Sequence, residues 1–209
     1  YNWKQPGESH IAQEADEKPP NDSGKNIIPA MLSKGERMAA YRFSGYWKDV
    51  GTIDSLWDAN MDMLSVHNGI DPYDTEWPIY ARTPTRPPHF TGPDAVVRHS
   101  LMTGGCVVDG EVENSVLFHS VTVEKGAKVR YSILMPGAVV KEGAEVSYAI
   151  VAEKAVIGAG AKVGAPPDPE GASEDWGIAV VAEGIKVGDG ATVAPKAMVT
   201  RNVKGGAAK

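Results

Sequence analysis

Asp49 is the residue whose type and position best suit chemistry. It lies in the segment 46–52, whose first residues indicate a short extended strand. Gly51 closes that strand, and Thr52 or Asp54 can cap the helix that follows. A carboxylate between a strand end and a helix start lies in an open cleft, where it can hold Mg²⁺, a cation that takes few protein carboxylates and uses substrate phosphates for the rest. The alternative is a solvated or helix-capping aspartate.

Other groups that could do chemistry form weaker patterns. The segments 158–160 and 188–190 imitate a phosphate-binding loop, but neither precedes a predicted helix. The five histidines are scattered and, with the single cysteine, form no cluster of zinc-ligand spacing. His119 remains as a candidate general base, because acyltransferases built on the fold predicted below use a histidine at an intersubunit cleft.

An apolar residue recurs every five or six positions over 106–163, so that three steps make one repeat of 17 residues. Glycines between these positions would each cost a helix about 1 kcal/mol, and sandwich strands alternate every second residue instead. The pattern predicts a mainly β fold, a left-handed parallel β-helix of hexapeptide repeats with small residues at its corners. The inward residues would be Cys106, Val112, Leu117, Val123, Val129, Leu134, Val140, Val146, Val151, Ile157 and Val163.

The coils are predicted to begin around Val96 and to form a domain over 95–209. The stretch 164–177 breaks the period and is expected to leave one corner as a loop, because strict sixes resume after it at Val181, Val187, Val193 and Val199. Residues 70–94 hold six prolines and several aromatic residues, which indicates an extended connector that packs onto a domain.

Residues 1–69 indicate the C-terminal remnant of an α/β domain. Helix and strand alternate there, but the strands are too few for a sheet with both faces covered, so the domain is expected to be truncated. The chain also begins at Tyr1 and not at an initiator methionine. The expected elements are helices over 3–17 and 27–35, strands over 38–43 and 46–50, and a helix from Thr52 or Asp54 to 67–69 with Leu56, Trp57, Met61 and Leu64 on its apolar face.

The composition suits a soluble protein. A net charge of −6 with 42% hydrophobic residues argues against general nucleic-acid binding. No apolar run has the length of a membrane helix, and no apolar signal segment stands at the start, so the cytoplasm is the expected location. Cys106 excludes an internal disulfide and is expected to be a core residue in a reducing compartment.

Several sequence motifs follow one another in an order that carries information: Gly24-Lys25-Asn26-Ile27-Ile28-Pro29, the segment 46–52, Trp77-Pro78-Ile79, Pro87-Pro88 and Ser132-Ile133-Leu134-Met135-Pro136-Gly137. In this order they resemble motifs of the sugar-phosphate nucleotidyltransferases, and most closely those of bacterial glucose-1-phosphate adenylyltransferases. The resemblance implies transfer of AMP from ATP to α-D-glucose 1-phosphate, which gives ADP-glucose for glycogen biosynthesis and pyrophosphate.

The resemblance also implies residue roles. Asp49 matches the family's aspartate that helps to hold the catalytic Mg²⁺ and lies against the sugar phosphate. Lys25 and Trp47 match positions near the cleft, and Ser23 stands where the family usually has phenylalanine. The family's Gly-rich ATP loop, its other metal-binding aspartate and its glucose 1-phosphate lysine match nothing in this sequence. This chain alone is therefore expected not to turn over.

In this family the β-helix contributes to a homotetramer and to a site for sugar phosphates or other metabolites that tune activity. Arg201 matches an arginine that the family often carries near this site, and Arg130 or Lys141 could add positive charge. The alternative for Arg201 is a solvated terminal charge.

Two other functions stay open at this point. A hexapeptide acyltransferase would use His119 as base, but residues 1–69 are not needed for that activity. A noncatalytic regulatory subunit of the adenylyltransferase family would have no reason to keep Asp49.

Overall fold

The computed structural model describes residues 22–65, 71–78, 80, 84–169 and 176–206. The chain divides into two units, Tyr1–Ser44 and Gly45–Lys209. The helix expected over 3–17 lies outside the described residues.

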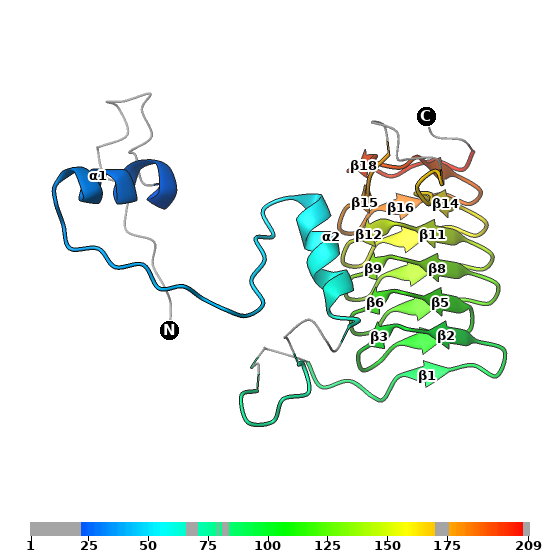
Figure 1. The fold of residues 1–209 in the computed structure, drawn as a ribbon. Coiled ribbons are helices and arrows are strands. Elements are labelled where there is room, and N and C mark those ends of the chain that lie inside the picture. The colour runs from blue at the N-terminus through cyan, green and yellow to red at the C-terminus, as the bar shows by residue number, and fades with distance from the viewer. Residues whose placement is uncertain (1–21, 66–70, 79, 81–83, 170–175, 207–209) are drawn as a thin grey trace, which may run out of the picture. The chain divides into compact units, whose positions relative to one another are not determined.

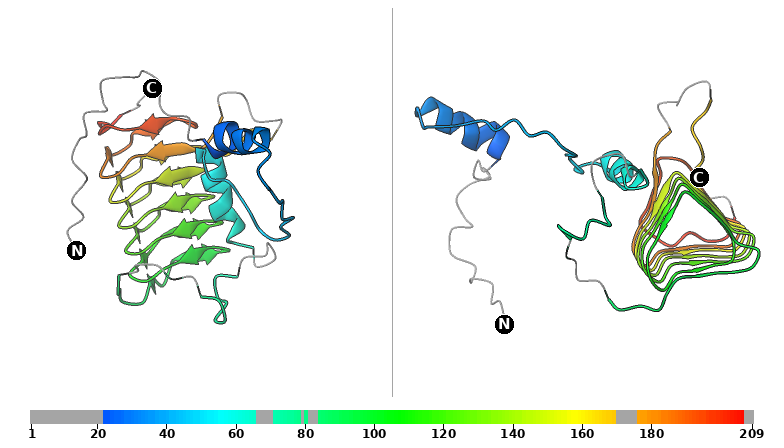
Figure 2. Two further views of the ribbon diagram at one scale, coloured as in Figure 1. Left: turned by 90° about the vertical axis from the view of Figure 1, so that its left-hand side faces the viewer. Right: turned by 60° about the horizontal axis from the view of Figure 1, so that its bottom comes forward.

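The second unit contains a parallel β-helix of triangular cross-section, in which every strand pairs with the strand three places further along the chain (Figure 1; Figure 2, right). The predicted fold class is confirmed. Sheet A holds β1 (Phe90–Thr91), β4 (Val107–Val108), β7 (Thr122–Val123), β10 (Val139–Val140), β13 (Val156–Ile157) and β16 (Lys186–Val187). Sheet B holds β2 (Val96–Arg98), β5 (Glu111–Glu113), β8 (Lys128–Arg130), β11 (Glu145–Ser147), β14 (Lys162–Val163) and β17 (Thr192–Val193). Sheet C holds β3 (Leu101–Met102), β6 (Val116–Leu117), β9 (Ile133–Leu134), β12 (Ala149–Val151), β15 (Ala179–Val181) and β18 (Met198–Val199).

The core is the inward column of each sheet, and it confirms the predicted series. In sheet A, Val140 pairs with Val123 on one side and Ile157 on the other, and all three are fully buried. One coil cannot bury its own apolar face, so each coil depends on the coil stacked against it. The stack begins at Phe90, earlier than the predicted start at Val96, because β1 pairs with β4 and the Phe90 amide donates to the Cys106 carbonyl at 2.8 Å.

The corner between sheets B and C is built by a ladder of serines. The Oγ atoms of Ser100 and Ser115 accept the amides of Ser115 and Ser132, both at 3.1 Å. The Oγ of Ser132 in turn accepts the amide of Ala149 at 3.2 Å. Ser115 and Ser132 are fully buried, so the ladder satisfies backbone amides that water cannot reach.

The outer surface of sheet B carries charges that alternate from coil to coil. Glu111 pairs with Lys128, Lys128 with Glu145, and Glu145 with Lys162. Arg130 stands beside this column and forms ion pairs with Glu111 at 3.1 Å and with a second glutamate, Glu113, at 3.6 Å.

The predicted loop over 164–177 leaves the stack after β14 and returns at β15. The Trp176 indole Nε1 donates to the Ala165 carbonyl at 2.9 Å and so joins the two described ends of the loop. Ile150 pairs with Val180 across the interruption, so the register of sheet C continues as predicted.

The first unit contains a single turn of π-helix, η1 (Ser23–Ile27), that continues into α1 (Ile28–Ser33). The Asp22 carboxylate caps η1 by accepting the Lys25 amide at 2.7 Å, and Gly35 follows with a positive φ of 69°. The helix predicted here is confirmed. The strands predicted over 38–43 and 46–50 are wrong, because neither segment has a ladder partner among the described residues, and a strand needs one.

The helix α2 (Ile53–Asp62) covers part of sheet C. Of the two predicted caps, Thr52 is the one used, in a reciprocal capping box with Ser55, and Asp54 lies in the first turn of the helix. Of its predicted apolar residues, Leu56, Trp57 and Met61 pack with three buried isoleucines of the β-helix, whereas Leu64 lies beyond the end of the helix and outside this cluster. The isoleucines are Ile133, Ile150 and Ile178. The helix ends at Asp62 and not near 67–69, because the next amides bond to carbonyls three residues back, which tightens the last turn.

From the sequence, the helix α2 was expected to belong to a first domain over 1–69. In the structure it lies in the same unit as the coils. The boundaries predicted for the three domains stay a prediction. None of the helices in the described residues is long and apolar enough to cross a membrane.

Candidate functional site

Asp49 lies in the turn that leads into α2, and its side chain is exposed. Its Oδ1 accepts the Gly51 amide at 3.0 Å, which fixes the carboxylate against its own backbone. A Cβ at Gly51 would lie 3.3 Å from the same oxygen, so glycine suits this close turn. No other hydrogen bond or ion pair of Asp49 is found within the described residues, and its Oδ2 is open to a ligand.

Asp49 could be one ligand of a Mg²⁺ ion, but the described residues do not form a complete coordination shell around it. Among the described residues there is no group of three or more histidine, cysteine, aspartate or glutamate side chains that could hold a metal. Mg²⁺ commonly uses one or two carboxylates and completes its octahedron with water and substrate phosphates. Asp49 could supply such a carboxylate, and its role as catalytic, substrate-binding and metal residue stays a prediction.

The segment before Asp49 is tied to the far end of α2 by Asp62. The Asp62 Oδ2 accepts the Tyr46 hydroxyl at 2.9 Å and the Lys48 Nζ at 2.8 Å. Lys48 also lies 3.7 Å from the Asp58 carboxylate, one turn earlier on the helix. The hydrogen bond from Lys48 lowers the pKa of Asp62, and the same bond raises the pKa of Lys48.

α2 in turn is fastened to the β-helix by an aromatic cluster. The Trp57 indole Nε1 donates to the Tyr131 carbonyl at 2.8 Å. The Tyr148 ring stacks between Trp57 and Tyr131, with centroid distances of 5.8 and 4.8 Å, and meets Trp176 edge-on at 5.5 Å. Both tyrosines have positive φ, 48° and 50°, a conformation that bulky residues rarely adopt.

Sequence reasoning missed Asp62 and this cluster. One signal was present: Asp58 and Asp62 stand four residues apart, on one face of the predicted helix, and Tyr46 and Lys48 precede that helix in the sequence. Nothing in the sequence alone brings Tyr131 and Tyr148 to Trp57, because that contact depends on how the helix lies on sheet C.

The three candidate effector residues are not brought together within this chain. Arg130 ends β8 at the corner between sheets B and C, where two glutamates pair with it. Lys141 follows β10 at the corner between sheets A and B, and Arg201 follows β18 after the last strand of sheet C. Lys141 and Arg201 are exposed.

His119 lies at the corner between β6 and β7. Its Nδ1 is buried and has no hydrogen-bond partner among the described residues. A general base is usually oriented by a third group, so this environment does not favour His119 as one.

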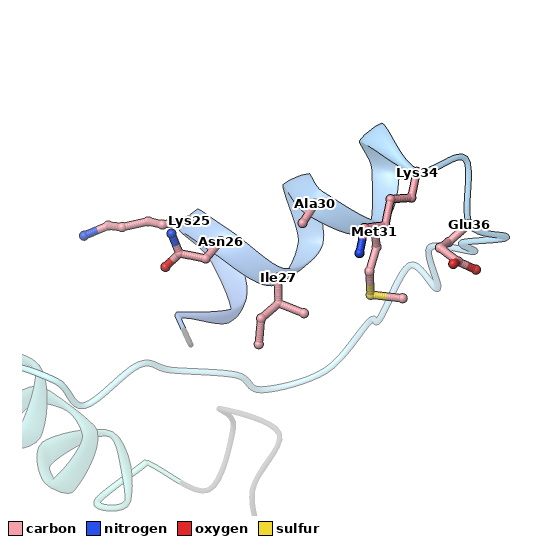
Figure 3. A pocket seen from close by; sticks show the side chains of 7 residues that line it. All are labelled: Lys25, Asn26, Ile27, Ala30, Met31, Lys34 and Glu36. Carbon is pink, nitrogen blue, oxygen red and sulfur yellow. The ribbon is translucent and has the colours of Figure 1, made fainter. Parts of the chain in front are cut away.

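Lys25 lines a hollow of the first unit, of about 540 Å³, together with Ile27, Met31 and Lys34 (Figure 3). The hollow is open to solvent, and its lysines are the only basic side chains that line it within the described residues. A second, smaller hollow of about 170 Å³ lies between the start of α2 and the end of sheet C.

The Lys48–Asp62 contact predicts a measurable pH dependence. The lowered pKa of Asp62 means that its contribution to stability is present above the unfolded pKa and is lost as the pH falls through the folded value. Substituting Lys48 by methionine (Lys48→Met) removes the largest cause, so the Asp62 pKa should rise toward its usual value. An NMR titration of the Asp62 carboxyl carbon checks this, and equal midpoints in both proteins would contradict it.

Two family models match the chain. The nucleotidyl transferase model matches residues 1–66, and the model of the GlmU-like C-terminal hexapeptide region matches residues 89–187. The two matches meet in space, because α2 from the first segment packs on coils of the second.

Curated relatives agree with these matches. The chain is 52% identical over 130 residues to a glucose-1-phosphate adenylyltransferase of Clostridium perfringens, which is 62% of this chain and 33% of the relative. It is 50% identical over 130 residues to the enzyme of Clostridium beijerinckii, 62% of this chain and 34% of that relative. It is 51% identical over 110 residues to the enzyme of Geobacillus stearothermophilus, 53% of this chain and 28% of that relative.

The matched part therefore spans about a third of the length of these relatives. The resemblance that the sequence motifs indicated is confirmed: residues 1–66 match a nucleotidyl transferase model, residues 89–187 match a GlmU-like hexapeptide model, and the chain is similar, at about half identity, to curated glucose-1-phosphate adenylyltransferases.

Proposed function

We propose that this chain is part of an enzyme that transfers AMP from ATP to α-D-glucose 1-phosphate and gives ADP-glucose, the donor for glycogen biosynthesis, and pyrophosphate. The observation that carries the proposal is the 52% identity over 130 residues to a protein named for this reaction. The position of Asp49, exposed in the turn that precedes a capped helix, supports it from the chain's own geometry.

In this reaction a phosphate oxygen of glucose 1-phosphate attacks the α-phosphorus of ATP, and pyrophosphate leaves, so no covalent enzyme intermediate is needed. Catalysis then rests mainly on holding the two substrates in line. Asp49 would hold Mg²⁺, which when bound neutralises charge on the reacting phosphates. The Gly51 amide donates to Oδ1 of Asp49, which would leave Oδ2 of the same carboxylate for the metal ion.

The β-helix would serve assembly and regulation, in a cytoplasmic homotetramer that responds to sugar phosphates or other metabolites. Apolar side chains on the outer surface of sheet A support self-association: Phe90 is 57% exposed and its strand neighbour Val107 is 39% exposed. Neighbouring apolar residues on a sheet surface commonly mark a contact with another chain.

The test is an assay of the intact protein, meaning this chain together with the rest of the enzyme to which we propose it belongs, with ATP, glucose 1-phosphate and Mg²⁺. Formation of ADP-glucose and pyrophosphate in equal amounts is the expected result. Binding of both substrates without product would favour a noncatalytic subunit instead, and acyl transfer from an acyl-coenzyme A would favour the acyltransferase alternative with His119 as base.

We expect Arg201 to bind the phosphate group of a regulatory sugar phosphate. Its guanidinium can form paired charge-assisted hydrogen bonds with phosphate oxygens. Arg201→Ala should shift the half-maximal concentration of an activating sugar phosphate upward and leave basal activity nearly unchanged. Lys204→Ala is the matched control, because it removes an exposed positive charge from the same tail. An activation curve that is the same in wild type and Arg201→Ala would remove Arg201 from the effector site.

A further inference from the structure

Asp62 accepts hydrogen bonds from two side chains that precede Asp49 in the sequence. The Tyr46 hydroxyl and the Lys48 ammonium reach the same carboxylate oxygen, at 2.9 and 2.8 Å. Trp47, between them, is 76% exposed. Tyr46 and Lys48 therefore face α2 while Trp47 faces away from it, which is the alternation of an extended chain. The same alternation places Asp49 on the open side with Trp47.

The carboxylate that holds this segment belongs to an element that cannot shift freely. α2 buries its apolar face against Ile133, Ile150 and Ile178 of the β-helix. Trp57, on the same helix, is fixed by its hydrogen bond to the Tyr131 carbonyl and by its stacking on Tyr148. A continuous set of contacts thus runs from the three coils that hold these isoleucines through α2 to the segment that carries Asp49.

We propose that Asp62 is a positioning residue for Asp49: by anchoring Tyr46 and Lys48 to α2, it makes the β-helix the frame that sets the place of the candidate metal carboxylate. The catalytic consequence rests on the function proposed above, whereas the anchoring itself does not.

Geometry makes Asp62, and not its neighbour, the anchor. The Asp58 carboxylate lies 3.7 Å from the Lys48 Nζ, beyond hydrogen-bond distance, and its side chain is 53% exposed. The Asp62 side chain is 29% exposed and accepts two short hydrogen bonds. Both are charge-assisted, because the acceptor is an ionised carboxylate, and such bonds are about twice as strong as neutral ones. Because the Tyr46 and Lys48 side chains both bond to Asp62, the segment 46–48 is attached to α2 at two residues. Two attachments restrict its rotation as well as its translation.

The experiment compares Asp62→Asn with its matched control Asp58→Asn in the intact protein. Each variant removes one carboxylate charge near Lys48 from the same face of α2. Asp62→Asn should speed hydrogen–deuterium exchange of the amides in 46–51 and lower kcat about tenfold or more, since misplacement of a reacting group by about 1 Å can cost a hundredfold. The KM for glucose 1-phosphate should change less than kcat. Asp58→Asn should match the wild type in both measurements.

Equal exchange over 46–51 in Asp62→Asn and Asp58→Asn would overturn the proposal, as would faster exchange in Asp62→Asn with an unchanged kcat in an active enzyme. If the wild-type protein makes no ADP-glucose, the proposed function fails, and the exchange comparison still decides whether Asp62 anchors the segment. Should Asp62→Asn fail to fold, Tyr46→Phe removes only one hydroxyl donor and must still speed exchange over 46–51. Exchange at the wild-type rate in Tyr46→Phe would then count against the anchor.

Discussion

Asp49→Asn should lower the turnover of the intact protein by about a hundredfold or more, the usual cost of removing one group that stabilises charge in a transition state. The amide keeps the size of the side chain and can still accept the Gly51 amide, so the turn should stay intact. It has no negative charge, however, and is a poor ligand for a hard cation. Because the Asp49 side chain is exposed, the fold and the assembly should be unaffected.

The control for this experiment is Asp54→Asn, which removes an exposed carboxylate in the first turn of α2, five positions further along the chain. Circular dichroism and the sedimentation of each variant show whether fold and assembly are kept. A turnover of Asp49→Asn within a factor of about three of wild type at saturating Mg²⁺, which is under 1 kcal/mol of barrier, would remove Asp49 from the reaction.

Ile157→Ala should lower the free energy of unfolding by about 2 to 5 kcal/mol, because it removes buried methylene groups and leaves a cavity that the stacked coils cannot close. Ile157 is fully buried and lies between Val140 and Val187, its partners in the neighbouring coils. Urea unfolding of wild type and variant measures the difference.

Lys162→Ala is the control from the neighbouring sheet. The Lys162 side chain is 63% exposed, and its ion pair with Glu145 is long, at 3.9 Å, so its loss should cost at most about 1 kcal/mol. Similar losses of stability at Ile157 and Lys162 would mean that the register of the coils is not the one described.

The β-helix could be predicted because its signal is local and repeated. Each coil places the same kinds of residue in the same surroundings, so the inward positions can be found from spacing alone. The segments 38–43 and 46–50 could not be predicted in the same way. Their aromatic residues and Val50 favour strands, but a strand exists only with a partner, and the described residues offer none.

The position of α2 could have been suspected from two pairs of residues. Ile133-Leu134 and Ile150-Val151 place apolar side chains on both surfaces of sheet C, although only one surface faces the core. Such a sheet needs a cover, and α2 supplies it. The turn and cap around Asp49 could be predicted from local rules, whereas the anchor at Asp62 depends on tertiary structure.

The alternating charges on sheet B have a consequence for how the chain finds its register while it folds. Inside the β-helix, one valine stacks on another equally well, so the apolar column cannot distinguish one coil from the next. Outside, a chain that skipped a coil would set Glu111 against Glu145 or Lys128 against Lys162, and like charges directly opposite each other repel. Charge repulsion on the outer surface of this sheet therefore destabilises misaligned stacking, which the valine column inside does not disfavour.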